Sequence, residues 1–363
     1  MQFIDLQRQY QSYKAEIQAE IDKVLDTSRY ILGPAVTELE QAMAAYLGVR
    51  HAIGCASGTD ALLLALMAMG IKPGDEVIVP DFTFFATAEM VSLLGAKPVF
   101  ADVQPDTLNL DPRQVEAKIT ARTRGVIAVS LYGQCADFDE LVEISRKHKL
   151  FLVEDAAQSF GATYQGRKSG ALCELGTTSF YPAKPLGAYG DAGALFTSDD
   201  ELAGRLRVLA NHGQPVTYRH RLVGINGRLD SLQAAILKVK LRHFPEELER
   251  RQQVAEWYDR ELQGLVATPQ VKPGNRSSWA QYTVRSPKRT HLQEHLKQKG
   301  IPTAIHYPMP LHRQEVYSTL GLRDEDFPVS VKASQEVFSL PMHPYLTHEE
   351  VKLVGAAVRE ALR

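Results

Sequence analysis

The hydrophobic pattern begins with two helical stretches and then changes to a regular alternation of short apolar runs and helical segments. Apolar positions recur at helical spacing over residues 9–28 and 34–46, and Gly48 ends the second stretch. The runs that follow predict strands at residues 52–55, 76–79, 98–101, 125–131 and 151–154, and the segments between them predict helices at residues 60–69, 86–94 and 138–147. Continuous apolar runs are typical of strands buried on both faces. We therefore expect an α/β fold with a mainly parallel sheet and helices on both sides.

Beyond Thr197 this alternation stops. The pattern there predicts a helix at residues 199–210, a polar and basic stretch at residues 212–228, and helices at residues 231–240 and 245–262. A smaller α+β unit follows, with strands expected at residues 281–284 and 303–306 and helices at residues 291–299 and 347–362. We expect a large domain over residues 1–250 and a small C-terminal domain over residues 251–363, with the boundary in the helix near residues 247–262.

Composition and charge narrow the class of protein. A chain of 363 residues has room for two domains, and a net charge of -2 argues against a generally basic nucleic-acid-binding protein. Cys55, Cys135 and Cys173 are widely spaced and form neither a disulfide framework nor a zinc-type pair, which favours a reducing compartment. No apolar run has the length of a signal peptide or of a membrane helix, so we expect a cytoplasmic protein that binds neither membrane nor nucleic acid.

The segment from Thr177 to Gly193 holds one lysine in an unusual setting. β-formers give way to alternating proline and glycine, which predicts a strand that runs into a turn, and Lys184 lies in that turn between Pro182 and Pro185 among aromatic residues. A lysine held there away from water would have its pKa lowered, as a Schiff-base lysine requires. The alternative is an ordinary surface lysine in a loop.

Three further groups follow predicted strands, and in open α/β sheets ligands bind beyond the carboxyl ends of the strands. Residues 56–60, with Ser57 and Thr59 at the start of a helix, offer the free N–H groups of a phosphate cradle. The alternative is that Ser57 or Thr59 is only an N-cap. No Gly-x-Gly-x-x-Gly follows the strand, so this is not a dinucleotide-binding fingerprint.

The other two groups supply aromatic rings and acids. Residues 81–85 place phenylalanines where one of them can stack on a planar ring, or where they can simply belong to the core. Residues 153–158 end a buried strand with Asp155, whose carboxylate needs a cationic partner. A protonated ring nitrogen or a structural arginine would satisfy it. Together the four groups match the demands of pyridoxal phosphate (PLP), for which the lysine forms an imine and the aspartate keeps the pyridine nitrogen protonated.

Several motifs carry a resemblance to a known family over essentially the whole chain. The sequence resembles the DegT family of PLP-dependent sugar aminotransferases in Ile31-Leu32-Gly33-Pro34, Glu38-Leu39-Glu40, residues 58–62, Gly74-Asp75-Glu76-Val77, residues 154–158, residues 179–184, residues 190–193 and Asn226-Gly227-Arg228. The resemblance implies PLP-dependent transferase fold type I, as in aspartate aminotransferase, with a seven-stranded, mainly parallel sheet in the large domain. It also implies a homodimer with both active sites at the subunit interface.

The same resemblance implies roles for individual residues. Lys184 is the expected imine lysine and proton shuttle, Asp155 is expected on the pyridine nitrogen, and Gln158 near the ring oxygen. The phosphate is expected on Gly58, Thr59 and Ser179, joined by Asn226 of the partner subunit, and Phe84 takes the position of the stacking aromatic. No metal is expected. Gly227 and Ala192 stand where many relatives carry other residues, which bears on the substrate pocket rather than on the cofactor.

Within the family the sequence is most similar to aminotransferases that act on UDP-2-acetamido-2-deoxy-3-oxo-glucuronate. The similarity lies in residues 129–138, 303–311 and 339–345. A substrate carboxylate favours a bidentate arginine, for which Arg228 is the candidate, with an ion pair to Asp230 as the alternative. His306 and Tyr307 are the other candidate substrate contacts, unless they are a core histidine and a packed tyrosine.

The expected reaction has two halves. L-Glutamate gives its amino group to the cofactor and leaves as 2-oxoglutarate, and the amino group then passes to the C3 keto group of the UDP-linked sugar acid, with lipopolysaccharide O-antigen synthesis as the expected pathway. The alternatives are a dTDP- or GDP-linked keto-6-deoxy sugar as substrate, or a non-catalytic regulator with the same fold. A third, a dehydratase with histidine in place of the lysine, is disfavoured by Lys184.

Overall fold

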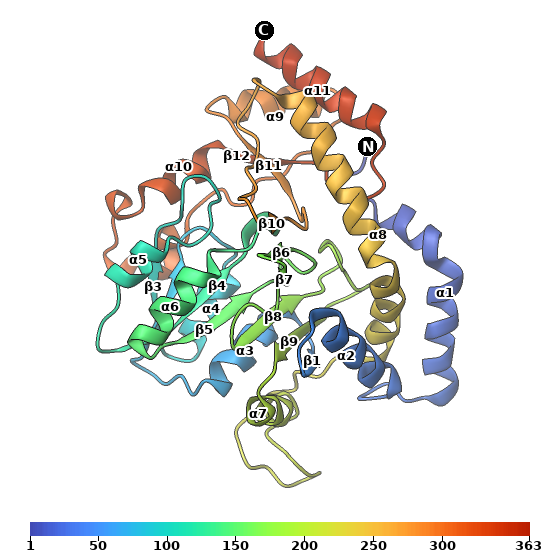
Figure 1. Ribbon diagram of the computed structural model, residues 1–363, viewed down its shortest axis with the longest axis vertical. Helices are drawn as coiled ribbons and strands as arrows, with labels where there is room; N and C mark the ends of the chain where they lie inside the picture. Colours follow the sequence, from blue (N-terminus) through green and yellow to red (C-terminus); the bar gives the residue numbers. More distant parts are fainter.

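A seven-stranded sheet lies at the centre of the computed structural model, which describes residues 1–363 (Figure 1). Its strand order is β1-β9-β8-β5-β4-β2-β3. The strands are β1 (His51–Cys55), β2 (Glu76–Pro80), β3 (Lys97–Ala101), β4 (Thr123–Val129), β5 (Phe151–Asp155), β8 (Leu175–Ser179) and β9 (Gly193–Thr197). Only β9 runs opposite in direction to the other strands, so the prediction of a mainly parallel sheet is confirmed.

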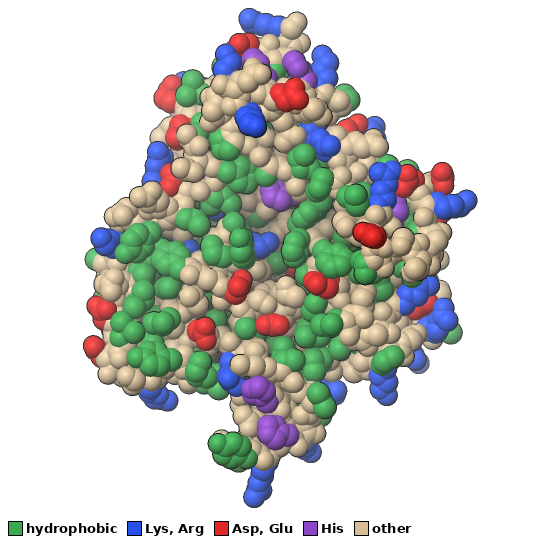
Figure 2. All heavy atoms as spheres, turned by 180° about the vertical axis from the view of Figure 1, so that it is seen from behind, with side chains coloured by type: hydrophobic (Ala, Val, Ile, Leu, Met, Phe, Trp, Pro, Cys, Tyr) green, Lys and Arg blue, Asp and Glu red, His purple; other side chains and the backbone are tan.

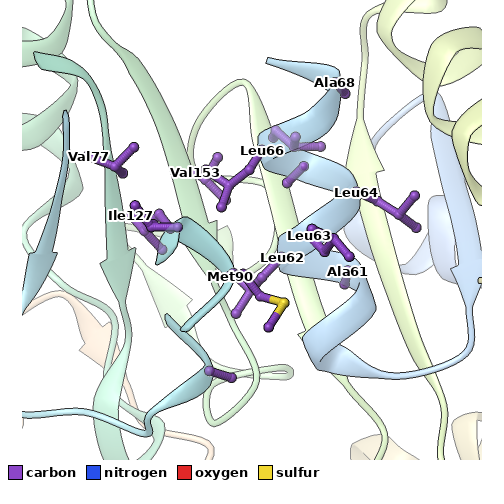
Figure 3. Packing of buried hydrophobic residues seen from close by; sticks show 14 of the residues in the cluster. Ala61, Leu62, Leu63, Leu64, Leu66, Ala68, Val77, Met90, Ile127 and Val153 are labelled. Carbon is purple, nitrogen blue, oxygen red and sulfur yellow. The ribbon is translucent and has the colours of Figure 1, made fainter. Parts of the chain in front are cut away.

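Alternate residues of each strand point to opposite faces of the sheet and into different cores. On one face Val77, Ile127 and Val153 pack against α3 (Gly58–Ala68), α4 (Ala86–Leu93) and α7 (Asp200–Ala210). Figure 3 shows Leu66 of α3 beside Val153, whereas Leu64 points to the other side of the helix. On the other face Ile78 and Leu152 pack against α5 (Pro112–Ala117) and α6 (Phe138–His148). Burial on both faces is the reason for the continuous apolar runs in the sequence.

The longest helix, α8 (Ser231–Leu262), corrects the prediction of two helices at residues 231–240 and 245–262. Pro245 lies inside it without ending it. A proline in a helix interior costs about 3 kcal/mol because it removes a hydrogen bond and crowds the preceding turn. Packing on both sides outweighs this cost: Phe244 is fully buried in a core with α2 (Pro34–Leu47), and Tyr258 is fully buried in a C-terminal core.

The N-terminal helix α1 (Leu6–Thr27) lies along α8 (Figure 1). Ile17 of α1 packs against Ile236 and Val239 of α8. Gln9 donates two hydrogen bonds of 2.9 Å to the carboxylate of Glu247. Most of the apolar face of residues 9–28 is therefore buried against α8, while Val24 joins the α2 core and Tyr10 contacts Tyr189.

The C-terminal part is built on a two-stranded antiparallel sheet, β11 (Tyr282–Arg285) and β12 (Val337–Leu340), with α9 (Arg289–Gln298), α10 (Pro328–Glu336) and α11 (His348–Leu362). The strand expected at residues 303–306 is wrong, because only Ala304 pairs, in a single bridge to Ser339. Pro302 and Pro308 limit the ladder on either side. Sequence reasoning missed α5, α10, β9 and β12.

Short elements complete the chain. They are β6 (Thr163–Tyr164), β7 (Arg167–Lys168) and β10 (Asn275–Arg276) in a three-stranded sheet, and the 3-10 turns Leu131–Gly133, Leu311–Arg313, Glu315–Leu320 and Asp324–Asp326. None of the helices has both the length and the apolar character that crossing a membrane requires. Leu311, Tyr317 and Phe327 belong to the α3 core although they follow residue 250, and the division at residues 250 and 251 stays a prediction.

We expect Gly176→Ala in β8 to destabilise the protein by about 1–3 kcal/mol, the usual cost of overpacking. A Cβ atom there would lie 2.1 Å from the carbonyl oxygen of Gly170, and backbone cannot move aside as a side chain can. Urea unfolding followed by tryptophan fluorescence measures the change. The matched control is Gly204→Ala in α7, where a Cβ meets nothing within 4 Å and stability should rise by up to about 1 kcal/mol. Equal midpoints for the two variants would contradict this account of the packing.

Candidate active site

The predicted phosphate cradle forms where the carboxyl end of β1 meets the start of α3. Ser57 is the N-cap of α3, and its hydroxyl accepts the N–H of Asp60 at 3.0 Å. The N–H groups of Gly58 and Thr59 lie in the first turn and have no acceptor within the helix, which suits an anion. A Cβ on Gly58 would lie 2.4 Å from the Cβ of Ser179, so this turn packs closely against the end of β8. Gly58 and Ser179 are thus brought together.

Asp155 ends β5 and is 6% exposed. Its carboxylate accepts the N–H of Ala157 at 3.0 Å and the hydroxyl of Thr87 at 3.3 Å. Burial raises the pKa of Asp155, and the Ala157 N–H, the charge of Lys184 and the Thr87 hydroxyl oppose that rise. No arginine pairs with Asp155, so the structural arginine considered as an alternative is absent. A buried carboxylate of this kind fits a cationic ring nitrogen.

Lys184 lies in the loop after β8 and is half-buried rather than fully exposed. Its own N–H donates to the carbonyl oxygen of Tyr181 at 2.8 Å, which closes a tight turn. Burial lowers the pKa of the Lys184 amine, and the carboxylate of Asp155 opposes this shift. Each group therefore lies within the electrostatic field of the other.

Gln158, predicted to lie near the cofactor ring, belongs to a hydrogen-bonded group of three residues. The side-chain oxygen of Gln158 accepts the N–H of Tyr132 at 3.0 Å, and its side-chain nitrogen donates to the hydroxyl of Tyr307 at 3.1 Å. The ring of Tyr307 lies 6.2 Å from the rings of both Phe82 and Phe84. Phe82 belongs to the core at 1% exposure, whereas Phe84 is 56% exposed and free to stack on a ligand.

His306 precedes Tyr307 and lies near the same lysine. Its Nδ1 is 2.9 Å from the hydroxyl oxygen of Ser339. Burial and the charge of Lys184 lower the pKa of His306 to about 4, so the imidazole is neutral at physiological pH. The hydroxyl of Tyr132 donates to the His306 carbonyl, which ties the residue to the loop after β4.

The backbone of Gly227 and Arg228 pairs with the end of β1, where Ala56 donates its N–H to the Gly227 carbonyl at 3.1 Å, but the side chains of Asn226 and Arg228 have no hydrogen bond to the residues above within one chain. Asn226 is exposed and forms a β-bridge with Asn211. Arg228 donates from Nη1 to the side-chain oxygen of Asn211 at 2.8 Å, while its buried Nε has no partner. It lines a cavity of about 240 Å³ together with Arg207. The alternative pairing of Arg228 with Asp230 is not found.

Sequence reasoning missed Thr87 and Tyr132 as members of the site. Thr87 lies in the first turn of α4, next to the aromatic segment that follows β2, and a hydroxyl at that helix start was a usable signal. Tyr132 has φ of 57°, in the left-handed region that non-glycine residues seldom adopt. No pattern in the sequence predicts that backbone conformation.

PLP needs three things from a protein: a carboxylate at its ring nitrogen, a lysine that can form the imine, and an anion site for its phosphate. A sheet of this topology with these groups at its carboxyl edge places the chain in the class of PLP-dependent transferases of fold type I. The model of the DegT/DnrJ/EryC1/StrS aminotransferase family matches residues 11–359. The chain therefore belongs to this family, and it is a PLP-dependent aminotransferase.

Similar proteins span nearly the whole chain. One relative, the UDP-2-acetamido-2-deoxy-3-oxo-D-glucuronate aminotransferase of Pseudomonas aeruginosa, is 52% identical over 359 residues, covering 99% of each chain. Another, from Geobacillus stearothermophilus, is called a pleiotropic regulatory protein and is 46% identical, covering 99% of this chain and 98% of its own. The crystal structure of DesV from S. venezuelae in complex with a ketimine intermediate superposes with a TM-score of 0.98 at 44% identity, covering 100% of this chain and 98% of that one.

Thr87→Val should weaken cofactor retention by about 10-fold or more, because a hydrogen bond to a charged group contributes about 1.5–3 kcal/mol. The change keeps the side-chain shape and removes only the hydroxyl that donates to Asp155. Fluorescence titration of the apo-protein with PLP measures the affinity. Thr83→Val is the matched control, since the hydroxyl of Thr83 is buried without a partner. If both variants bind PLP like the unmodified protein, Thr87 has no part in the site.

Proposed function

We propose that this aminotransferase moves an amino group from L-glutamate to the C3 keto group of a UDP-linked 3-oxo-2-acetamido glucuronic acid. The chemistry is carried by one observation: a half-buried lysine and a buried aspartate without an ion-pair partner affect each other's pKa at the carboxyl edge of the sheet. The substrate is supported by 52% identity, over 99% of the chain, to a relative named for that sugar.

Lys184 is the proposed proton carrier. Its lowered pKa increases the fraction of neutral amine, and only the neutral form can take a proton from Cα of the amino donor. In the second half-reaction the same nitrogen returns a proton to the sugar carbon that receives the amino group. The turn that closes between Tyr181 and Lys184 restricts the lysine backbone during both transfers.

Asp155 and the cradle would hold the cofactor. Bound PLP supplies the electron-withdrawing ring and the carbon that stores the amino group between the two half-reactions. Asp155 would accept a hydrogen bond from the ring nitrogen, and Gln158, whose amide is fixed from both ends, would lie near the ring oxygen. Gly58, Thr59 and Ser179 would bind the phosphate, with Phe84 stacked on the ring.

His306 and Tyr307 would contact the sugar, and Arg228 of the partner subunit its carboxylate. A neutral His306 near Lys184 does not compete with the lysine for the charge of Asp155. Arg228 suits the carboxylate because its guanidinium is only partly engaged, with Nε buried and unpartnered beside a cavity. Bidentate binding of a carboxylate would use donors that Asn211 leaves free.

The proposed active unit is a homodimer. Tyr30, Ile31, Leu32 and Tyr181 are between 44% and 54% exposed although they are large and apolar. Figure 2 shows hydrophobic side chains gathered around the middle of one face of the molecule. Such a face favours a protein–protein interface. Asn226 would then reach the phosphate of the other subunit, which agrees with its exposure in one chain.

The three cysteines are free, which supports a reducing cytoplasm as the proposed location. A UDP-linked 3-amino sugar acid as product would suit lipopolysaccharide O-antigen synthesis. The similarity to a relative called a pleiotropic regulatory protein favours a regulator as the second candidate function. A regulator has no chemical need for a lysine and a buried aspartate that act on each other's pKa, so the catalytic proposal is preferred.

Single-turnover absorbance tests the substrate. With the cofactor first converted to its amine form by L-glutamate, we expect the original absorbance band to return with the UDP-linked 3-keto acid, and not with dTDP-linked 3-keto or GDP-linked 4-keto 6-deoxy sugars. Lys184→Met should abolish the response with every sugar. Return with a 6-deoxy sugar would replace the proposed substrate, and no change on adding glutamate would favour the regulator.

Mixed dimers test the shared site. Asn226→Ala and Lys184→Ala should each be inactive or nearly so, because each removes a group that every site requires. On mixing and exchange of subunits, about a quarter of all sites in a random mixture regain both groups if Asn226 acts across the interface. Activity per site measures the recovery. A mixture that stays at the level of the separate variants would show that Asn226 does not serve the other subunit.

A further inference from the structure

One buried lysine lies beneath the proposed active-site loop without touching the proposed cofactor residues. Lys240 of α8 is 2% exposed, and it is the only buried lysine in the chain. Its ammonium donates to the carbonyl oxygen of Gly187 and lies 5.1 Å from the ring centre of Tyr189. No carboxylate is within ion-pair distance of it. The charge of Lys240 is therefore buried with a single neutral hydrogen-bond acceptor.

The loop that Lys240 contacts is closed on itself. Lys184 follows Tyr181 in a turn, and a Cβ on Gly187 would lie 2.3 Å from the carbonyl oxygen of Pro182. The backbone at Gly187 thus packs directly against the backbone that leads into Lys184. A shift of Gly187 toward Pro182 would therefore displace the backbone that carries Lys184.

A second side chain of the same helix holds the next part of the loop. The side-chain oxygen of Gln233 accepts the N–H of Tyr189 at 2.9 Å. Gln233 and Lys240 are seven residues apart, so they lie two turns apart on one face of α8. The helix itself is held by the α2 core and by α1. The loop is consequently attached to a rigid element at two points.

Burying an ammonium group costs desolvation free energy that an apolar side chain in the same place would not. Burial lowers the pKa of Lys240 to about 8, an effect that the charge of Glu247 opposes and that of Arg251 reinforces. A methionine of similar length would fill the same volume without the desolvation cost of a charge. What it would lack is a donor for the Gly187 carbonyl, so the function of Lys240 lies in that hydrogen bond.

We propose that Lys240 is a positioning residue: through the Gly187 carbonyl it fixes the loop that presents the amine of Lys184 to the cofactor. This inference rests on the role of Lys184 in the proposed function. A displacement of about 1 Å at a reacting atom reduces rates by up to about 100-fold. Loss of the hydrogen bond should therefore slow the chemistry of Lys184 while the protein remains folded.

The test compares Lys240→Met with Lys238→Met. Lys238 lies on the same helix but pairs with Glu20 and Glu38 and has no contact with the loop. Three quantities are measured: the rate at which apo-protein captures PLP, the pH midpoint of the bound cofactor's visible absorbance, and amide hydrogen exchange over residues 181–190. For Lys240→Met we expect capture about 10- to 100-fold slower, a displaced midpoint and faster exchange, with the melting temperature no lower than that of Lys238→Met.

Gln233→Met provides a second, independent variant, because it removes the other attachment of the loop and should change the same three quantities in the same direction. If Lys240→Met fails to fold, the outcome for Gln233→Met decides. Faster exchange with unchanged capture and midpoint in the folded variants would overturn the proposal, since the lysine would then serve only loop stability. A general loss of protection across the protein would overturn it as well. Failure of the unmodified protein to capture PLP, or capture by Lys184→Met at the unmodified rate, would instead contradict the proposed function.

Discussion

The structure is organised around a carboxylate that is buried without a cation of its own. Asp155 is buried at the end of β5. Its carboxylate accepts hydrogen bonds only from the N–H of Ala157 and the hydroxyl of Thr87. In a low-dielectric site such a charge is costly unless a cation meets it. Lys184 supplies part of that field, and the proposed ring nitrogen of PLP would supply the rest. Burial lowers the pKa of Lys184 and raises that of Asp155, and the charge of each residue opposes the shift of the other. The lowered pKa of Lys184 leaves more of its amine free to accept a proton, beside a carboxylate that can pair with a positive ring.

The sheet provides this arrangement because parallel strands deliver their carboxyl ends to one edge. β1 leads into the cradle, β5 ends in Asp155 and β8 ends in Ser179, while the antiparallel β9 returns the chain after the lysine loop. The side chains of Gln233 and Lys240 on α8 hydrogen-bond to the backbone of that loop. Phe180, Leu186 and Ala188 of the same loop region are buried in the core that α8 shares with α2.

Much of the candidate site could be predicted from the sequence because the carboxyl ends of parallel strands lie at the same edge of the sheet. Asp155 and Ser179 end strands, and Gly58 and Lys184 lie in the segments after strands. A Cβ on Gly58 would meet Ser179, and Asp155 and Lys184 act on each other's pKa. Thr87 and Tyr132 were missed because their roles depend on partners far along the chain. Thr87 bonds a residue 68 positions away, and Tyr132 one that is 174 positions away. No local pattern carries such information.

The sequence by itself determined most of the alternating strands and helices of the large sheet, its mainly parallel character and the types of group at its edge, because hydrophobic periodicity and turn residues act locally. Tertiary structure decided the rest. Packing from both cores kept α8 continuous through Pro245, and two prolines left a single bridge where a strand was expected near Ala304. Arg228 found Asn211 instead of Asp230. These outcomes depend on contacts between residues far apart in the sequence, and such contacts form only when the whole chain is folded.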